Sequence, residues 1–266
     1  MANADQERSG EFVQSLDRGL AVIRAFDSQH PSLTLSDVAR ATGLSRAAAR
    51  RFLHTLVELG YVGTDGKEFS LRPRVLELGH SYLSSLTLPE VATPHLKHLA
   101  EQTGESTSVA ILDGDDIVYV ARVAAYRIMA VAITVGTRLP AHATSMGRVM
   151  LACGPAERRE RFLEGAGLEA ITDRTITDVS ALRAELERIR EQGWALVDQE
   201  LEDGLRAVAA PIADASGEVV AAVNVSAPAR AGDVSELLDR VLPPLLATAA
   251  DIQHDLSRTG TRLPSR

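Results

Sequence analysis

The sequence predicts an α+β protein with a helical first third, followed by a mostly antiparallel sheet of about six strands with helices at either end. Two patterns predict this class. Apolar residues recur at helical spacing through the first 60 residues, whereas short apolar runs separated by turn residues dominate from Thr107 to Ser226. Grouped strands bounded by helices indicate an α+β rather than a parallel α/β architecture. The length of 266 residues fits one or two domains.

The composition excludes several classes of protein. With 45% hydrophobic and 24% charged residues, the chain is globular rather than disordered. It contains no run of about 18 apolar residues, so we expect no membrane-spanning helix and no membrane partner. The polar stretch Met1–Gly10 excludes a secretory signal, and the single cysteine, Cys153, fits a reducing compartment. We therefore expect a cytoplasmic protein.

The net charge of −8 is unevenly distributed along the chain. Through Ser85 there are ten basic and ten acidic residues, and after it 18 basic and 26 acidic residues. The excess acidity belongs to the C-terminal two-thirds, which argues against a protein that binds nucleic acid over its whole surface. A local DNA-binding surface in the first third remains compatible with this charge, because phosphate attraction acts within about 10 Å at ordinary salt.

Three short helices and a hairpin are expected in the first third. The predicted helices cover Leu16–Phe26, Leu35–Ala41 and Ser45–Leu59. Ser15 is the expected N-cap of the first helix, which should bury a face containing Leu16 and Leu20. Ser45 should cap the third helix, and Gly60 should end it. Strands at Tyr61-Val62 and Phe69–Leu71 flank Asp65-Gly66, which is a strong hairpin turn signal.

Residues 34–53 have the pattern of a helix-turn-helix. Ala39 supplies the small residue needed where two helices cross, and Gly43, four residues later, permits the sharp turn. Arg46 and Arg50 lie one turn apart on the outward face of the second helix, so both can enter one major groove. Guanidinium groups suit phosphate oxygens and the paired acceptors of guanine.

The hairpin that follows the helix-turn-helix is a candidate wing, whose tip residue Lys67 could contact the DNA backbone. The alternative is that the arginines form an ordinary solvated helix face. The combination of small residue, turn glycine, cap and hairpin favours DNA binding. The candidate DNA-contacting residues are Ser45, Arg46, Arg50, Arg51, His54 and Lys67.

The rest of the chain is expected to alternate strands and helices after a helix that begins at Pro73. A domain boundary is placed near Leu88. The expected strands are Thr107–Leu112, Ile117–Val123, Ile128–Val135, Trp194–Asp198, Ala207–Ile212 and Val219–Ser226. The expected helices are Thr144–Ala152, Thr177–Gln192 and Val234–Leu256.

The segment Leu139–Ala152 is the candidate ligand pocket, in which a loop leads into a helix that begins near Thr144. A helix start offers unpaired backbone N–H groups and a partial positive charge, and so can bind a small anion. The hydroxyls of Thr144 and Ser145 could assist, and Arg138 in the loop could supply a guanidinium fork for a carboxylate. Met146 could form an adaptable apolar wall.

A structural interpretation of this segment is equally open. Thr144 or Ser145 could simply cap its own helix, and His142 could hydrogen-bond a loop carbonyl. Asn224 and Ser226 form a second polar interruption on one face of an apolar strand, and they either line a cavity or satisfy a bulge.

The absent motifs disfavour catalysis and metal binding. The sequence has no GxSxG, P-loop, GxGxxG or Cys/His metal spacing, so we expect no cofactor and no metal. His142 and Ser145 lack an obvious orienting acid, which makes a hydrolase triad a poor candidate. The acidic residues Asp198, Glu200, Glu202 and Asp203 are expected to form a solvated loop rather than a cation site.

Taken together, these segments resemble the IclR (isocitrate lyase regulator) family of bacterial transcription factors over nearly the whole chain. The resemblance rests on Ser15–Leu20, the helix-turn-helix, Leu139–Ala143, and the stretch from Asp198 through Gly204-Leu205-Arg206 to Pro211. Phe12–Leu16 and Thr144–Arg148 further resemble the branch that regulates protocatechuate, 4-hydroxybenzoate and β-ketoadipate pathways.

The resemblance implies a winged helix-turn-helix domain at residues 12–72, a dimerisation linker helix at 73–88 and a GAF-like effector domain at 89–256. It also implies homodimers or pairs of dimers. The pocket positions that it implies are Ser145, Met146, Val197, Asp198, Ala207, Asn224 and Ser226, which join Arg138, His142 and Thr144 as candidate effector-binding residues. Met146 and Asn224 disfavour glyoxylate-like ligands and favour a larger, flat acid.

The leading hypothesis is therefore a dimeric regulator that binds operator DNA and responds to a small organic acid, either an aromatic acid or a dicarboxylate. An alternative is an enzyme acting on an organic acid, with His142 as general base and the N-terminal helices as a dimerisation arm. A purely architectural DNA binder does not explain the long acidic domain.

Overall fold

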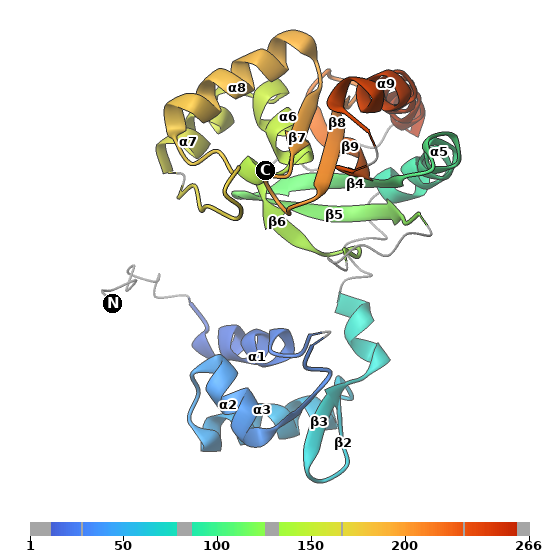
Figure 1. The fold of residues 1–266 in the computed structure, drawn as a ribbon. Helices are drawn as coiled ribbons and strands as arrows, with labels where there is room; N and C mark the ends of the chain where they lie inside the picture. Colours follow the sequence, from blue (N-terminus) through green and yellow to red (C-terminus); the bar gives the residue numbers. More distant parts are fainter. Residues whose placement is uncertain are drawn as a thin grey trace. The chain divides into compact units, whose positions relative to one another are not determined.

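The computed structural model describes residues 12–27, 29–78, 87–125, 133–165, 167–230 and 232–259. The chain divides into two compact units, Met1–Tyr82 and Leu83–Arg266 (Figure 1). The predicted linker helix, 73–88, falls partly outside the described residues. Its described part is a 3₁₀ turn, Pro73–Val75, followed by helical residues 76–78. The domain boundaries given above remain predictions. No helix in the described ranges is long and apolar enough to cross a membrane.

The N-terminal unit packs three helices against a small antiparallel sheet. The helices are α1 (Gln14–Arg24), α2 (Leu35–Thr42) and α3 (Arg46–Glu58), and the strands are β1 (Ser32–Thr34), β2 (Val62–Thr64) and β3 (Glu68–Leu71), in the order β1-β3-β2. Val22, Val38 and Leu53 are fully buried at the centre of this unit, one from each helix. Helices α2 and α3 form the predicted helix-turn-helix, and β2 and β3 form the predicted hairpin.

Helix capping explains where these helices begin and corrects one expectation. The Thr34 hydroxyl accepts a hydrogen bond from the Asp37 backbone, and the Asp37 carboxylate accepts one from the Thr34 backbone, which completes a capping box at α2. Gly43 adopts the left-handed conformation, φ 67°, that the turn requires. Ser45 caps α3 as predicted. The prediction for Ser15 is wrong, because α1 begins at Gln14 and has no side-chain cap.

The apolar face expected for α1 is only partly buried within one chain. Val22 and Phe26 join the core, but Leu16 is 62% exposed and Leu20 is 44% exposed. The prediction that both leucines face the interior of this unit is therefore wrong.

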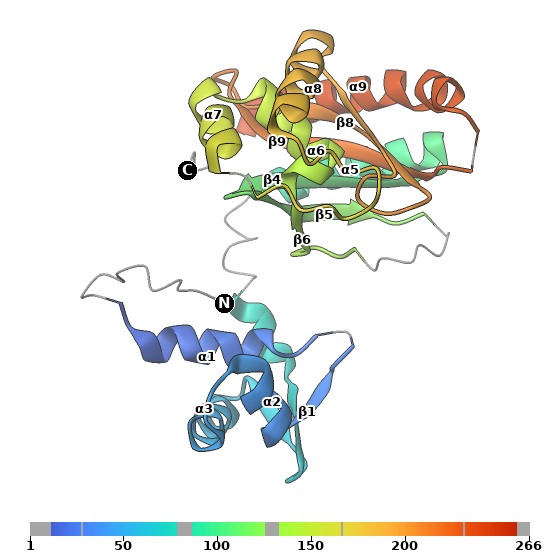
Figure 2. The ribbon, with the colours of Figure 1, turned by 60° about the vertical axis from the view of Figure 1, so that its left-hand side comes forward.

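The C-terminal unit has a six-stranded, fully antiparallel sheet between two layers of helices (Figures 1 and 2). Its strands are β4 (Ser106–Asp113), β5 (Asp116–Val123), β6 (Arg138–Pro140), β7 (Ala195–Asp198), β8 (Leu205–Ala213) and β9 (Val219–Pro228), in the order β6-β5-β4-β9-β8-β7. Its helices are α5 (Thr87–Thr103), α6 (Ser145–Cys153), α7 (Ala156–Gly165), α8 (Val179–Gln192) and α9 (Val234–Thr259). The predicted class is thus confirmed.

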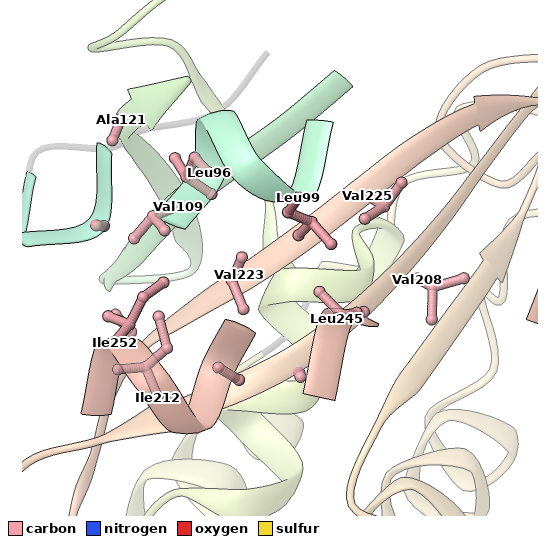
Figure 3. Packing of buried hydrophobic residues seen from close by; sticks show 14 of the residues in the cluster. Leu96, Leu99, Val109, Ala121, Val208, Ile212, Val223, Val225, Leu245 and Ile252 are labelled. Atoms are coloured by element: carbon pink, nitrogen blue, oxygen red, sulfur yellow. The ribbon is translucent and has the colours of Figure 1, made fainter. Parts of the chain in front are cut away.

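The two faces of the sheet carry different side chains because strand residues alternate in direction. Larger residues such as Val223 and Ile212 pack against α5 and α9 (Figure 3). The opposite face carries alanines, among them Ala209 and Ala222, against α6, α7 and α8. Small residues let the start of α6 approach the strands closely, which places it over the middle of the sheet.

One predicted strand lies mostly outside the described residues, and an unpredicted strand forms after it. The run Ile128–Val135 was expected as the third strand, but residues 128–132 lie outside the described residues, and Ile133–Val135 is not a strand. Arg138–Pro140, expected as a loop, instead forms the edge strand β6, which pairs with Asp116–Val118. Three residues are too few to show a periodicity, so the sequence offers no signal for this strand.

Candidate functional site

The outward face of α3 presents the predicted DNA-contacting side chains. Ala49, Leu53 and Leu56 anchor the inner face in the core. Arg46 and Arg50 on the other face are exposed, and within the described chain no hydrogen bond or ion pair engages their guanidinium groups. Two free forks one helical turn apart can bind phosphate oxygens or base edges.

The neighbouring candidates extend the same exposed region. Arg51 and His54 are exposed, and the His54 ring contacts Phe69 of β3 edge-on, with ring centroids 6.5 Å apart. This contact joins α3 to the hairpin. Ser45 has a structural task, since its Oγ accepts a hydrogen bond from Ala48 N at 3.2 Å.

The wing tip is a tight turn stabilised by one carboxylate. Asp65 Oδ1 accepts hydrogen bonds from the backbone N–H groups of Lys67 and Glu68, each at 2.8 Å. These bonds favour the ionised carboxylate and lower the pKa of Asp65. Asp65 Oδ1 is thus occupied by the backbone, while the Lys67 side chain is exposed.

The C-terminal unit encloses a buried pocket between the sheet and the start of α6. Its lining includes six predicted effector-binding residues: Thr144, Ser145, Val197, Ala207, Asn224 and Ser226. Five other lining residues were not predicted from the sequence, namely Tyr119, Ile133, Ala143, Leu201 and Leu205. The cavity measures about 20 Å³, room for about one water molecule. A ring-sized ligand therefore requires the pocket to expand.

Two oxygen atoms in this pocket are buried without a hydrogen-bond partner in the described structure, Ser145 Oγ and Asn224 Oδ1. Ser145 is the first residue of α6, where backbone N–H groups and the helix dipole favour a negative or acceptor group. Asn224 Nδ2 donates to Ser226 Oγ at 3.2 Å, so the amide has one satisfied end and one unsatisfied end. Buried polar groups are normally paired, and unpaired ones in a pocket indicate a polar ligand.

Two predicted site residues near this helix have structural partners. Thr144 caps α6, because its Oγ1 accepts a hydrogen bond from Gly147 N at 3.1 Å. His142 Nε2 lies 3.0 Å from the Glu169 carbonyl oxygen. Both contacts match the structural interpretation left open by the sequence. Thr144 nevertheless lines the pocket, whereas His142 does not.

The structure places three further predicted residues outside the pocket lining. Arg138 lies on β6, where its guanidinium pairs with Asp113 at 2.5 Å and Asp116 at 3.2 Å. Met146 is 1% exposed in the core beneath α6. Asp198 Oδ1 accepts a hydrogen bond from Arg206 Nε at 2.8 Å. The position of Arg138 follows from the unpredicted edge strand β6, which replaces the predicted loop.

A buried ion pair supports the start of α6. Arg148 is 1% exposed, and its guanidinium is paired with the Glu200 carboxylate through both oxygens, one contact measuring 2.7 Å. Arg148 Nε also donates to the His142 carbonyl at 2.6 Å, and Glu200 Oε2 accepts from Ile176 N at 3.1 Å. The expectation that Glu200 lies in a solvated acidic loop is therefore wrong. No metal-binding cluster occurs among the residues that the structure describes.

Tyr119 is the missed pocket residue with the clearest chemistry. It lies on β5 and is 3% exposed. Burial raises the pKa of its phenol to about 12, so the hydroxyl remains protonated near neutral pH. Its position in an alternating strand could have signalled an inward side chain, but nothing in the sequence relates this strand to the pocket.

A helix-turn-helix with exposed arginines, joined in one chain to a unit that encloses a polar pocket, defines a ligand-responsive DNA-binding regulator. Comparison with known proteins agrees. Residues 15–66 match the IclR helix-turn-helix domain, and residues 80–254 match the bacterial transcriptional regulator IclR C-terminal domain. The chain belongs to the IclR family of bacterial transcriptional regulators.

Individual relatives carry more specific names. The chain is 48% identical to the Pca regulon regulatory protein of Pseudomonas putida, over 92% of this chain and 85% of that one. It is 38% identical to the p-hydroxybenzoate hydroxylase transcriptional activator of Acinetobacter baylyi, over 95% of each chain. It also resembles the structure of an IclR homologue from Microbacterium hydrocarbonoxydans complexed with 4-hydroxybenzoate, with 28% identity, a TM-score of 0.79 and coverage of 92% of this chain and 99% of that one.

These matches decide between the hypotheses drawn from the sequence. The matched families and relatives are transcriptional regulators and not enzymes. The protein is therefore a regulator, and the enzyme with His142 as general base is not favoured.

Proposed function

We propose that this regulator controls genes for the breakdown of aromatic acids, and that its effector is a hydroxylated benzoic acid such as 4-hydroxybenzoate or protocatechuate. The observation that carries the proposal is the pair of unpartnered buried oxygens, Ser145 Oγ and Asn224 Oδ1, in a pocket that is otherwise apolar apart from a few hydroxyls. An aromatic acid supplies a flat apolar ring together with the polar groups that these atoms lack. The names of the two curated relatives support the same class of ligand.

The DNA-binding part of the proposal assigns base contacts to Arg46 and Arg50. Arg51, His54 and Lys67 are assigned to contacts with the phosphate backbone. Ser45 is assigned to the same backbone, because it caps the start of α3 that approaches the DNA. Their exposure on α3 and on the wing supports this assignment. Phosphate contacts position a protein on DNA, whereas base contacts specify the sequence.

We further propose that the protein acts in the cytoplasm as a homodimer, or as a pair of dimers. Leu16 and Leu20 on α1 are large apolar side chains that one chain leaves exposed, which supports burial against a second copy. A two-fold dimer would present two recognition helices to two half-sites.

The proposal is tested by titrating the purified protein with a panel of benzoic acids while monitoring thermal unfolding and retardation of DNA upstream of its own gene. A ligand that binds only the folded state stabilises it by about 2.7 kcal/mol at a concentration one hundred times Kd. The midpoint of thermal unfolding rises accordingly. We expect hydroxybenzoates to stabilise the protein and to change the DNA complex. If short aliphatic acids act and hydroxybenzoates do not, the proposed effector class is wrong.

A further inference from the structure

A half-buried arginine, Arg122 on β5, is separated by a single strand, β4, from the pocket residue Asn224 on β9. The strand register places Arg122 of β5 opposite Ser108 of β4, and Ser108 opposite Asn224 of β9. Residues directly opposite each other share one face of a sheet, so the three side chains form a row on the pocket face. Arg122 Nη1 donates to Ser108 Oγ at 3.2 Å, so the guanidinium extends across β4 towards Asn224.

Arg122 does not line the closed cavity, but a bulge places it on the same face of the sheet as the pocket residues. The register between β4 and β5 shifts between Val109 and Ala110, which adds one residue to β5. Tyr119, which lines the pocket, and Arg122 therefore lie on one face of the sheet although they are three residues apart. The intervening Val120 and Ala121 join the core on the opposite face.

The charge on Arg122 has no counter-ion in the described chain. Its only described hydrogen-bond partner is the neutral hydroxyl of Ser108. Burial lowers the pKa of the guanidinium, as expected for a cation that has lost solvent without gaining a carboxylate. The other inward arginines of this unit differ, since Arg148 pairs with Glu200 and Arg206 pairs with Asp198.

An unpaired charge that is partly removed from water is unfavourable until an opposite charge arrives. Residues 126–132, which follow β5, contain no Asp or Glu that could serve. A planar guanidinium is the side chain best suited to bind a carboxylate through two parallel hydrogen bonds.

We infer that Arg122 binds the carboxylate of the effector, so that the acid group lies over Ser108 on β4 and the ring extends towards Ala207 and Val197. This inference rests on the proposed function and deepens it, because it names the residue that makes the pocket selective for an acid. It gives Arg122 the role that the sequence had suggested for Arg138. In the structure Arg138 is satisfied by two aspartates on the β6 edge.

The test compares an acid with its neutral isostere on the full-length protein. Isothermal titration calorimetry with 4-hydroxybenzoate and 4-hydroxybenzamide is performed on the wild type and on the Arg122→Gln, Arg122→Lys and Arg138→Gln variants. We expect Arg122→Gln to weaken binding of the acid at least about tenfold, because a buried charge pair loses one partner. Binding of the amide should change little, and Arg122→Lys should recover part of the affinity for the acid.

Arg138→Gln is the matched control, since it removes an arginine from the neighbouring strand and should leave both affinities unchanged. The ligand-free thermal midpoint of Arg122→Gln should equal or exceed that of the wild type, because the variant removes an uncompensated cation. Wild-type affinity of Arg122→Gln for the acid would overturn the inference, as would an equal loss for acid and amide together with a lowered midpoint. If the wild type binds no hydroxybenzoate, the proposed function fails first and this inference fails with it.

Discussion

At the scale of single residues, the pocket combines satisfied and unsatisfied polar groups. Thr144 and His142 have partners in the protein, whereas Ser145 Oγ and Asn224 Oδ1 have none in the described structure. An unsatisfied buried polar group costs about 1–3 kcal/mol, so the folded protein is less stable than it would be with a ligand in place. The sequence placed all four residues near one site, but only coordinates separate the structural pair from the ligand-binding pair.

We predict that Ser145→Leu abolishes the response to the effector while operator binding without effector persists. The leucine side chain fills a cavity of about 20 Å³ and removes a hydroxyl, and overpacking of this kind typically costs about 1–3 kcal/mol of stability. Gel retardation with and without hydroxybenzoate measures the response. Ser180→Leu, on the exposed face of α8, is the matched control and should respond normally. Loss of DNA binding in Ser145→Leu alone would assign Ser145 to folding.

We predict that Arg50→Ala weakens operator binding by about 1–3 kcal/mol and relaxes the preference at one base position, because a fork contacting a base edge is lost. Fluorescence anisotropy on a set of single-base operator variants measures both effects. Arg40→Ala removes one positive charge from the same unit but lies on α2 in an ion pair with Asp37. It should leave the base preference unchanged. An unaltered affinity in Arg50→Ala would remove α3 from its assigned role.

At the scale of elements, local signals were enough for the N-terminal unit and insufficient for the sheet. Gly43 and Ser45 act through their own backbone neighbours, so the turn and the start of α3 follow from the sequence. The edge strand β6 and the bulge at Val109/Ala110 depend on the partner strand, and no single segment encodes them. This is why the sequence predicted Arg138, and not Arg122, as the arginine that binds a carboxylate.

The ion pair between Arg148 and Glu200 joins α6, the loop at Ile176 and the turn between β7 and β8. We predict that Glu200→Gln lowers the free energy of unfolding by about 3–5 kcal/mol, because it leaves a buried guanidinium without its counter-charge. Urea unfolding followed by circular dichroism measures this change. Glu160→Gln breaks a partly exposed pair with Arg183, whose two side chains are each 42% exposed, and should have a much smaller effect. Equal effects of the two variants would show that burial does not govern the strength of the Arg148 pair.

At the scale of the whole molecule, charge and function are divided in the same way. The basic α3 surface belongs to the first unit, and the acidic excess belongs to the second. Acidic side chains repel the phosphate backbone, so the effector unit should not bind DNA by itself. The uneven charge along the sequence predicted this division of charge correctly.

For a two-fold dimer, the spacing of the operator half-sites is a geometric requirement. We predict that inserting five base pairs between the half-sites greatly weakens binding, because half a helical turn places them on opposite faces of the duplex. Inserting ten base pairs should restore part of the affinity, since one full turn is about 10–10.5 base pairs. Quantitative footprinting measures the series, and sedimentation of the free protein measures its mass. A monomer that protects a single half-site would contradict the dimer.

The small volume of the closed pocket has a consequence for how the sensor is tuned. The free energy needed to open the pocket between α6 and the sheet reduces the net binding free energy of the effector. The effector concentration at which the regulator responds therefore depends on how readily this pocket opens. Substitutions that loosen the packing around Met146, which does not line the pocket, should make the regulator respond to a lower concentration of the effector. Sensitivity in this protein is therefore adjustable without altering which molecule it recognises.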